Sequence, residues 1–382
     1  MVKIIHLISG LFVGGAETTL YKLISRMNVT HFQNMVVCLI EIGPVGDDIR
    51  CLGVPVYSLG MHRSRPSPLG LLRLVRLLKG ERPDILQTWL YHADLLGLAA
   101  GKLARAPVTV WNLRASNMDM SQYRRLSGWT LEACAHLSRW PEAVVVNSEA
   151  GRLSHAQIGY SPRHWVLIPN GIDLQQFKPD LAARLDVRRE LGLAPETLLI
   201  GLVARFDPMK DHVTFLRAAG QLAQIEPLVH FVLAGDGVTP DNQFLSDQIA
   251  QADLTRRVHL LGRRLDVPRL TAALDIASSS SYSEGFPNVV GEAMACGVPC
   301  VVTDVGDSAK IVGNTGIVIP AKDPQRLAEG WRKMIEMGAE GRQELGRAAR
   351  EWIERNYSLD RVVQQYENLY LSLVERQRSR AS

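Results

Sequence analysis

The chain is short of the residues that build metal sites and disulfide-rich domains. Its 382 residues include five cysteines, which are scattered and form no Cys-x2-Cys pair. Cys296 and Cys300 are close in sequence, a spacing that we attribute to packing rather than ligation. No apolar run approaches membrane-spanning length, and Lys3–Ile8 is too short for the core of a signal peptide. These absences favour a protein of the reducing cytoplasm.

Several chemical signatures are also missing. The sequence has no Asp-x-Asp, so a divalent cation held on a phosphorylated ligand by that motif is not expected. It has neither a G-x-x-x-x-G-K-S/T phosphate loop nor a Gly-x-Ser-x-Gly nucleophile elbow. We therefore expect no metal and no cofactor. Any phosphate would be neutralised by Lys and Arg side chains and by helix N–H groups.

The pattern of apolar residues predicts the fold class. Nearly continuous apolar runs such as Lys3–Ile8, Leu198–Ala204 and Val298–Thr303 alternate with amphipathic segments such as Val213–Gln224. This alternation predicts an α/β fold with doubly wound parallel sheets covered by helices on both faces. Ligands of such sheets bind beyond the carboxyl ends of the strands, so two facing domains would create one cleft.

The length exceeds the size at which one hydrophobic core usually stops growing, so two domains are expected. The turn cluster Pro169–Asp173, followed by the polar stretch Gln175–Ala194, predicts the boundary between them. The Arg-rich segment Arg376–Arg380 is expected to be a frayed tail. The expected parts are a first Rossmann-like domain, a second one, and a C-terminal helix that crosses back to the first, over residues 1–173, 174–356 and 357–382.

Charge is unevenly distributed along the chain. Residues 1–180 carry 19 Lys and Arg against 13 Asp and Glu, whereas the remainder is slightly acidic. Leu69–Lys79 is typical of a basic amphipathic helix, and further basic and aromatic residues are Tyr123, Arg124, Arg125, Trp129, Arg139 and Trp140. Such groups suit an anionic membrane surface or a lipid-diphosphate partner, and no nucleic-acid partner is expected. The alternative is a packing helix with a solvated cationic face.

The segment from Glu284 to Glu292 is the most informative motif. A glycine-proline turn, containing Gly285 and Pro287, leads into a predicted helix, whose N-terminus favours a phosphate. Glu284 lies before that helix and Glu292 about one turn into it, where it can accept hydrogen bonds from a ribose. The alternative for such an acid pair is a helix-entry charge and a surface acid.

Three other segments follow predicted strands. Gly14 and Gly15 allow a ligand close to the backbone at a predicted helix start, although the dinucleotide fingerprint is missing and a simple tight turn is the alternative. Arg205 and Lys210 can hold a departing diphosphate, or they are solvated surface cations. His92 can bond a sugar hydroxyl or move a proton, or it is a structural histidine.

Taken together, these motifs resemble those of the retaining glycosyltransferase family 4, also called group 1, which has the GT-B fold. The matching segments keep their order along nearly the whole chain: Gly14–Glu17, the His92 loop, Pro169–Asp173, Arg205 with Lys210, Leu233–Gly237, Val258–Gly262 and Ser283–Glu292. The resemblance implies two Rossmann-like domains and an enzyme that transfers a hexosyl unit from a nucleotide diphosphate sugar, UDP- or GDP-linked, to a saccharide or lipid-linked saccharide acceptor. It also implies polysaccharide or lipopolysaccharide assembly at the cytoplasmic face of the membrane.

The resemblance also implies a role for each motif. Arg205 and Lys210 would bind the donor diphosphate, Glu292 would bind the ribose, and Glu284 would act at the donor sugar. Gly14 and Gly15 would approach the diphosphate from the first domain, and His92 would contact the sugar near the reacting face. Further donor contacts are implied for the turn residues Gly285, Phe286, Pro287, Asn288 and Val289, and the base is placed near Gly235–Gly237 and Arg263–Leu265.

Other functions stay open from the sequence. A nucleotide-sugar 2-epimerase shares the GT-B fold, and a non-catalytic sugar-binding protein would also need such a site. A NAD-dependent dehydrogenase would need the glycine fingerprint that this chain lacks. The acceptor is expected in the first domain, where Arg114, Ser116, Asn117 and residues 119–140 are candidates.

Overall fold

A computed structural model describes residues 1–62, 68–106, 108–114 and 125–381. The chain divides into two compact units, each with its own sheet and core. The first unit comprises Met1–Gly171 with the C-terminal segment that begins at Leu359, and the second comprises Ile172–Ser358. The predicted α/β class is confirmed, because every strand pair in both sheets is parallel and helices cover both faces.

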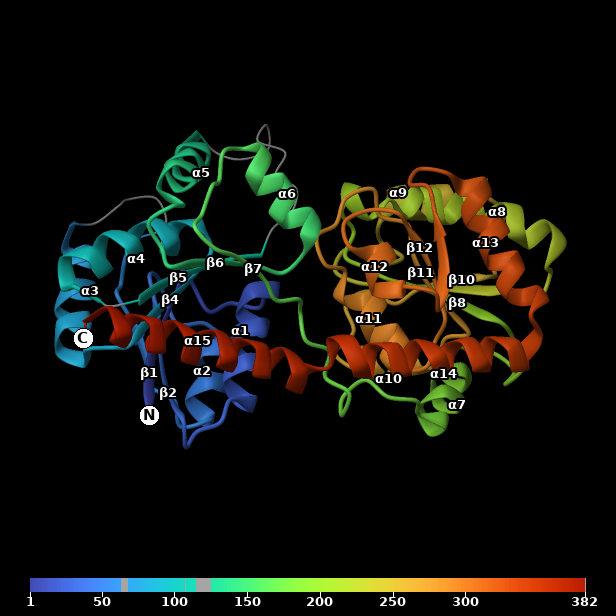
Figure 1. The fold of residues 1–382 in the computed structure, drawn as a ribbon. Helices are drawn as coiled ribbons and strands as arrows, with labels where there is room; N and C mark the ends of the chain where they lie inside the picture. The colour runs from blue at the N-terminus through green and yellow to red at the C-terminus, as the bar shows by residue number, and fades with distance from the viewer. Residues whose placement is uncertain (63–67, 107, 115–124, 382) are drawn as a thin grey trace. The chain divides into compact units, whose positions relative to one another are not determined.

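The first unit has a seven-stranded sheet in the order β3-β2-β1-β4-β5-β6-β7 (Figure 1). Its strands are β1 (Val2–Ile8), β2 (Phe32–Cys38), β3 (Val56–Ser58), β4 (Ile85–Trp89), β5 (Val108–Leu113), β6 (Ala143–Val146) and β7 (Trp165–Leu167). Its helices are α1 (Gly15–Arg26), α2 (Pro44–Cys51), α3 (Pro68–Glu81), α4 (Tyr91–Ala104), α5 (Arg125–Leu137), α6 (Glu149–Gln157) and α15 (Leu359–Ala381). Because most strand residues are buried on both faces, the strands are almost continuously apolar.

The second unit has a six-stranded sheet in the order β10-β9-β8-β11-β12-β13. Its strands are β8 (Leu199–Val203), β9 (His230–Ala234), β10 (Val258–Leu260), β11 (Ile276–Ser279), β12 (Cys300–Thr303) and β13 (Gly316–Ile319). Its helices are α7 (Leu181–Glu190), the 3₁₀ turn η2 (Pro208–Lys210), α8 (His212–Ile225), α9 (Gln243–Gln251), α10 (Val267–Ala272), α11 (Asn288–Ala295), α12 (Ser308–Val312), α13 (Pro324–Glu336) and α14 (Gly338–Tyr357).

The polar stretch Gln175–Ala194 that follows the predicted boundary contains α7, whose N-cap Asp180 accepts a hydrogen bond from the Ala183 amide at 2.9 Å. One expectation about the end of the chain is wrong. The segment Arg376–Arg380 is helical rather than frayed, since α15 continues to Ala381. Buried residues of α15, such as Tyr366 and Tyr370, pack into the core of the first unit and stabilise the helix through tertiary contacts.

The described part of the chain contains no helix that is both long and apolar enough to span a membrane. The sheets matter for the site because all their strands run the same way within a unit. The loops that follow the strands therefore gather at one edge of each sheet. The predicted site residues lie in these loops and in the helices that follow them.

Candidate functional site

The carboxyl edge of the second sheet is a set of loops held together by their backbones. The Ala204 amide, after β8, donates to Ala234 at the end of β9 at 2.8 Å, and the Gly235 amide donates to Gly262, after β10, at 2.8 Å. A Cβ at Gly235 would stand 2.1 Å from the Ala204 carbonyl oxygen, so no larger residue fits there. These contacts give the loops a fixed arrangement on which side chains can be placed.

The structure brings Lys210 and Glu284 together at this edge. The Lys210 ammonium donates to Glu284 Oε1 at 2.5 Å, and the Ser281 hydroxyl donates to the same oxygen at 2.7 Å. The Lys210 and Glu284 side chains are 23% and 11% exposed, so the pair is largely withdrawn from water. Charges that are partly shielded from water have stronger electrostatic interactions with a ligand than fully solvated charges do.

The loop before α8 positions Lys210. Asp207 caps η2 by accepting a hydrogen bond from the Met209 amide at 2.9 Å. The Lys210 carbonyl accepts from the Ser280 hydroxyl at 2.9 Å, and the Tyr282 amide donates to the Met209 carbonyl at 3.0 Å. The loop after β8 is therefore fastened to the loop after β11, which carries Glu284.

Arg205 has a different environment from Lys210. Its side chain is 63% exposed, and its Nε and Nη2 donate to Asp207 Oδ2 at 3.1 and 2.9 Å. Burial acts to raise the pKa of Asp207, but the Met209 amide and the Arg205 guanidinium together bring it below the ordinary value. Arg205 is thus paired with its own loop in this structure, and a bound anion would compete with Asp207 for it.

The Glu284–Asn288 turn rests on the loop after β12. The Asp307 amide donates to the Gly285 carbonyl at 2.9 Å, and Gly306 has a φ of 58°. A Cβ at Gly306 would stand 2.5 Å from the Glu284 carbonyl oxygen. Phe286 is buried, with its ring 5.7 Å from that of Tyr357. These contacts with Gly306, Asp307 and Tyr357 therefore fix the position of the Glu284–Asn288 turn.

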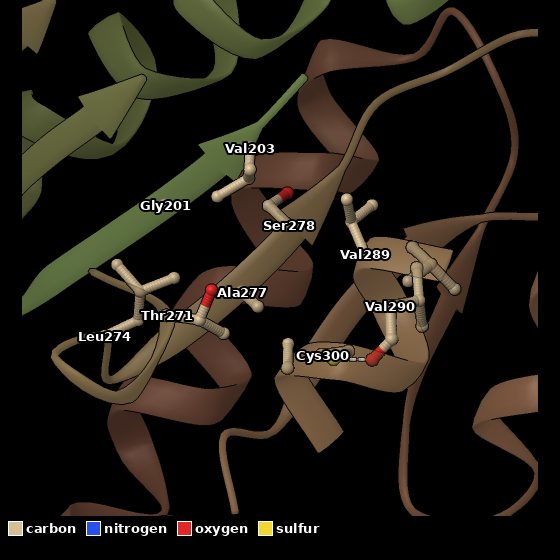
Figure 2. A pocket seen from close by; sticks show the side chains of 11 residues that line it. Gly201, Val203, Thr271, Leu274, Ala277, Ser278, Val289, Val290 and Cys300 are labelled. Atoms are coloured by element: carbon tan, nitrogen blue, oxygen red, sulfur yellow. Dashed lines mark hydrogen bonds between the residues drawn. The ribbon is translucent and has the colours of Figure 1, made fainter. Parts of the chain in front are cut away.

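Helix α11 begins at Asn288, with Pro287 as its N-cap, so the proline precedes the first helical residue. Glu292 is the fifth residue of this helix and is partly exposed. Val289 and Val290 face a cavity of about 20 Å³ beneath the helix (Figure 2). The cavity is lined mainly by apolar groups and has room for about one water molecule, so it is not where a nucleotide sugar would bind.

A larger hollow of about 280 Å³ lies elsewhere in the second unit, where β11 and β12 begin. It contains Arg184 and Asp275, which form an ion pair at 2.6 Å. It lies near the amino ends of these strands, away from the carboxyl edge. We do not assign the donor to it.

The region predicted for the base contains a charge network. Arg264 pairs with Glu190 of α7 and with Asp266, the latter at 2.7 Å, and Arg269 joins the same two acids at 3.1 Å each. Hydrogen bonds from Arg264 lower the pKa of Asp266. Leu265 is exposed. The network fixes the loop after β10 to α7 and leaves the side chain of Leu265 on the surface.

In the first unit, the glycine loop after β1 leads into α1, and Glu17 lies against the start of this helix. A Cβ at Gly14 would stand 2.5 Å from Glu17 Oε2, so the Glu17 carboxylate lies against the start of α1. Burial raises the pKa of Glu17, and a backbone hydrogen bond opposes that effect. Nothing among the described residues lies within 4 Å of where a Cβ of Gly15 would stand. The chain's own acid thus occupies the helix end where an anion was predicted, while Gly15 is open.

His92 lies in the first turn of α4, next to a strained residue. Leu90, the N-cap, has φ 73° and ψ 152°, a region that essentially only glycine adopts without cost. Burial lowers the pKa of His92, which favours a neutral imidazole. The turn is fixed by Tyr91, whose hydroxyl lies 2.8 Å from His155 Nε2, and by Asp94, which accepts a hydrogen bond from the Thr88 hydroxyl.

The predicted acceptor region is described only in part. Ser116, Asn117, Tyr123 and Arg124 lie outside the described residues. Of the other candidates, Trp129 in α5 is exposed, and Lys102 Nζ lies 5.3 Å from the Trp140 ring centre. Within the described ranges, no group of three or more His, Cys, Asp or Glu is placed to hold a metal ion.

Three residues at the carboxyl edge of the second sheet were missed in the sequence analysis. They are Ser281, which bonds Glu284, Asp207, which pairs with Arg205, and Gly306, which supports the turn. The run of serines after β11 and the Asp-Pro pair after β8 are visible signals, because small polar residues often end a strand and cap a turn. Gly306 also follows a strand, but only the fold shows which loop it supports.

Comparisons with known proteins show the family of this chain. The family model described as glycosyl transferases group 1 matches residues 184–352, and the model of glycosyltransferase family 4 matches residues 13–176. Together they account for most of both units. The chain belongs to the group 1, family 4 glycosyltransferases and is an enzyme of that class.

Two relatives match over most of their length. The putative glycosyltransferase EpsF of Bacillus subtilis is 28% identical over 92% of this chain and 90% of its own. The UDP-Gal:alpha-D-GlcNAc-diphosphoundecaprenol alpha-1,3-galactosyltransferase of Escherichia coli is 25% identical over 84% of this chain and 85% of its own.

Solved structures confirm the GT-B fold. Anabaena HepE in complex with UDP has a TM-score of 0.85 and 24% identity, covering 97% of this chain and 100% of that one. Sucrose-phosphate synthase from Thermosynechococcus elongatus has a TM-score of 0.76 and 19% identity, covering 100% of both chains. At these identities the likeness concerns the fold alone.

Proposed function

We propose that this enzyme transfers a hexosyl unit from a UDP- or GDP-sugar to a saccharide or lipid-linked saccharide acceptor, with retention of anomeric configuration and without a metal ion. Its place would be in cell-surface polysaccharide or lipopolysaccharide assembly at the cytoplasmic side of the membrane. The named activity of the Escherichia coli relative and the complex of HepE with UDP support a nucleotide sugar donor.

The Lys210–Glu284 pair carries this proposal. Sugar transfer passes through a cationic, oxocarbenium-like sugar beside a departing diphosphate. Lys210 supplies positive charge for the diphosphate, and Glu284 supplies negative charge for the sugar, from positions 2.5 Å apart. Donor binding would draw the ammonium from the carboxylate toward the phosphate. Glu284 would then stabilise and orient the sugar rather than act as a nucleophile.

The other predicted residues have supporting roles in this proposal. Arg205 would exchange Asp207 for a phosphate oxygen, Glu292 would accept hydrogen bonds from the ribose, and the amides of the turn would contact the sugar. A donor phosphate oxygen would take the acceptor proton. The amides concerned are those of Gly285, Phe286 and Asn288, while Pro287 and Val289 would be further donor contacts. Gly14, Gly15 and His92 of the first unit would also contact the donor.

A peripheral contact with an anionic membrane is also proposed. Leu69, Leu72, Arg76 and Lys79 are exposed on α3 and recur at helical spacing. Such a face can insert leucines into a lipid interface while the cations meet phosphate groups. Sedimentation with vesicles of neutral and of about 30% anionic lipid, with the Arg76→Gln/Lys79→Gln variant as comparison, tests the contact.

A two-stage experiment tests the function. First, UDP- and GDP-sugars are screened for a rise in melting temperature, because a ligand of the native state stabilises it. Second, the stabilising donor is incubated with saccharide and lipid-linked acceptors in EDTA, and the product's anomeric configuration is determined by NMR. Isomerised donor without any acceptor would show an epimerase instead, and an inverted product would contradict retention.

Variants connect the activity to the site. Glu284→Gln and Lys210→Ala should each lower turnover at least about 100-fold, the scale for removing one transition-state charge partner, with an intact fold by circular dichroism. Arg326 and Glu329 form an exposed ion pair at 3.0 Å on α13 and provide matched controls. Arg326→Ala and Glu329→Gln should retain turnover. Near wild-type turnover in Glu284→Gln would remove the proposed role.

A further inference from the structure

Six of the buried polar atoms that lack partners in the first unit gather around neighbouring strands of its sheet. They belong to strands or strand ends that are neighbours in the order β1-β4-β5-β6. None of these atoms has a hydrogen-bond partner in the described part of the chain. They are Ser9 Oγ, Gln87 Nε2, Asn112 Oδ1, both Nη atoms of Arg114, and Asn147 Oδ1.

Arg114 is the charged member of this group, which we call the β5 edge group. The residue is half-buried, but Nη1 and Nη2 are fully buried, and no described residue forms an ion pair with it. Its guanidinium carbon lies 5.3 Å from the Trp89 ring centre. Burial lowers the pKa of Arg114, an effect partly offset by Tyr366, which also contributes a side-chain hydrogen bond, and by Tyr370. Ring faces and phenols cannot neutralise a guanidinium.

The neighbouring polar groups are satisfied on the side that α15 covers. Asn112 Nδ2 donates to the Tyr366 hydroxyl at 2.9 Å, and the Tyr370 hydroxyl donates to Gln87 Oε1 at 3.0 Å. The same two side chains leave Asn112 Oδ1 and Gln87 Nε2 unpaired. A structural network alone would leave fewer atoms unsatisfied, since each unpaired buried group costs free energy. Water can supply hydrogen bonds, but it cannot supply the missing negative charge.

The unpaired atoms have the chemistry of a saccharide site with one anion. Amide oxygens accept hydrogen bonds from sugar hydroxyls, an amide NH₂ and a serine hydroxyl donate to them, and a guanidinium binds a pair of anionic oxygens. All but Gln87, which lies in the middle of β4, are also at or just beyond the carboxyl ends of their strands, where ligands of this architecture bind. The donor already has cations of its own in Arg205 and Lys210.

We propose that Arg114 binds an anionic group of the acceptor, a phosphate or the carboxylate of an acidic sugar, and that the β5 edge group binds the adjoining saccharide. This inference rests on the proposed transferase function and names the acceptor class: a saccharide that carries negative charge. Arg114 is a specificity residue in this scheme, because a neutral acceptor leaves its buried charge unpaired.

Anion binding can be measured without the acceptor. The full chain carrying Arg205→Ala and Lys210→Ala removes the donor cations, and its melting temperature is recorded with inorganic pyrophosphate, glucuronate or glucose. Pyrophosphate or glucuronate should raise it by at least about 4 °C at about 100-fold the dissociation constant, and glucose should not. Pyrophosphate alone would indicate a phosphate, and glucuronate alone an acidic sugar. No rise with either anion would overturn the proposal.

Substitutions at Arg114 in the same background assign the effect. Arg114→Met should abolish the rise, whereas Arg114→Lys keeps the charge and should retain part of it. Arg163→Met removes an exposed cation just before β7 of the same unit and should leave the rise unchanged. Without anion, Arg114→Met should melt no lower than its parent, because it removes an unpaired buried charge. An equal rise in the Met and Lys variants and the parent would contradict the assignment.

Transfer kinetics complete the test. With a phosphorylated or acidic acceptor, Arg114→Met in the otherwise wild-type chain should raise KM at least about 30-fold, more than it lowers kcat. Stabilisation of the wild-type chain by a nucleotide sugar tests the transferase function separately. If no nucleotide sugar stabilises the chain while stabilisation by pyrophosphate depends on Arg114, the transferase function is contradicted and the anion site is supported. The reverse result removes the anion site alone.

Discussion

The Lys210 ammonium and the Glu284 carboxylate meet at 2.5 Å although 74 residues separate them in the sequence. Both lie in loops that follow strands of one parallel sheet, β8 and β11, which pair directly. The Ser281 hydroxyl donates to the same carboxylate oxygen. The fold therefore brings a cation and a carboxylate from distant parts of the sequence together.

Removing one member of this pair should cost more stability than removing both. Lys210→Met leaves the Glu284 charge in a largely buried position, and we expect a loss of about 2 kcal/mol, reduced from the fully buried value because Lys210 is partly exposed. Adding Glu284→Gln should recover about half of that loss. Urea unfolding compares Lys210→Met, Glu284→Gln and the double variant with the wild type. Strictly additive losses would mean that the two charges do not interact.

Gly306 should be required for activity more than for stability. A Cβ there would collide with the carbonyl oxygens of Glu284 and Gly285, so Gly306→Ala should displace the turn. We expect kcat/KM to fall at least about tenfold. The left-handed alanine should also lower the free energy of unfolding by roughly 1 kcal/mol. Gly338 provides the control, because its φ is also positive, at 71°, and a Cβ there meets nothing described within 4 Å. Gly338→Ala should lose only the roughly 1 kcal/mol of its left-handed φ and keep its activity.

Strand periodicity and strand-end position were enough to predict the α/β fold and to place Lys210 and Glu284 in loops at a sheet's carboxyl edge. Their mutual contact was not predictable, because it depends on β8 and β11 being neighbours although β9 and β10 come between them in sequence. For the same reason the support that Gly306 gives to the turn could not be foreseen. Both are consequences of strand order rather than of local pattern.

Other features escaped the sequence because tertiary packing outweighs local composition. The tail around Arg376–Arg380 has the charge of a disordered end, yet it continues a helix whose earlier turns bury Tyr366 and Tyr370. Arg114 was named only as an acceptor candidate. Its burial without an ion-pair partner depends on Trp89 and α15, which come from distant parts of the chain.

The strain at Leu90 should reverse the usual order of alanine and glycine. At ordinary positions a glycine variant is less stable than alanine by about 0.5–1 kcal/mol. At φ 73° and ψ 152° a Cβ is itself costly, so Leu90→Gly should be more stable than Leu90→Ala by about 1 kcal/mol. The exposed Leu181, at the start of α7, should show the usual order. Urea unfolding of the four variants decides, and the usual order at Leu90 would argue against strain beside His92.

The buried His6 should make the first unit less stable in mild acid. Its Nε2 lies 3.0 Å from Asn34 Oδ1 and its Nδ1 accepts from the Trp89 indole, so the ring is neutral with the proton on Nε2. Burial lowers the pKa of His6 from 6.5 to about 4, and the bond to Asn34 opposes this only in part. Between pH 6.5 and about 4, His6 is therefore protonated in the unfolded chain and neutral in the folded chain.

The sign of the effect follows from that difference. Above pH 6.5 neither state is protonated at His6 and its contribution is constant, whereas between pH 6.5 and 4 the unfolding free energy should fall by up to about 3 kcal/mol. His6→Gln should flatten this slope by up to one proton in the unfolding transition of the first unit, even if the variant is less stable throughout. His31→Gln, at an exposed position of the same unit, is the control and should keep the wild-type slope. Equal slopes in wild type and His6→Gln would show that His6 is protonated in the folded chain, and hence that its bonds to Asn34 and Trp89 are not as described.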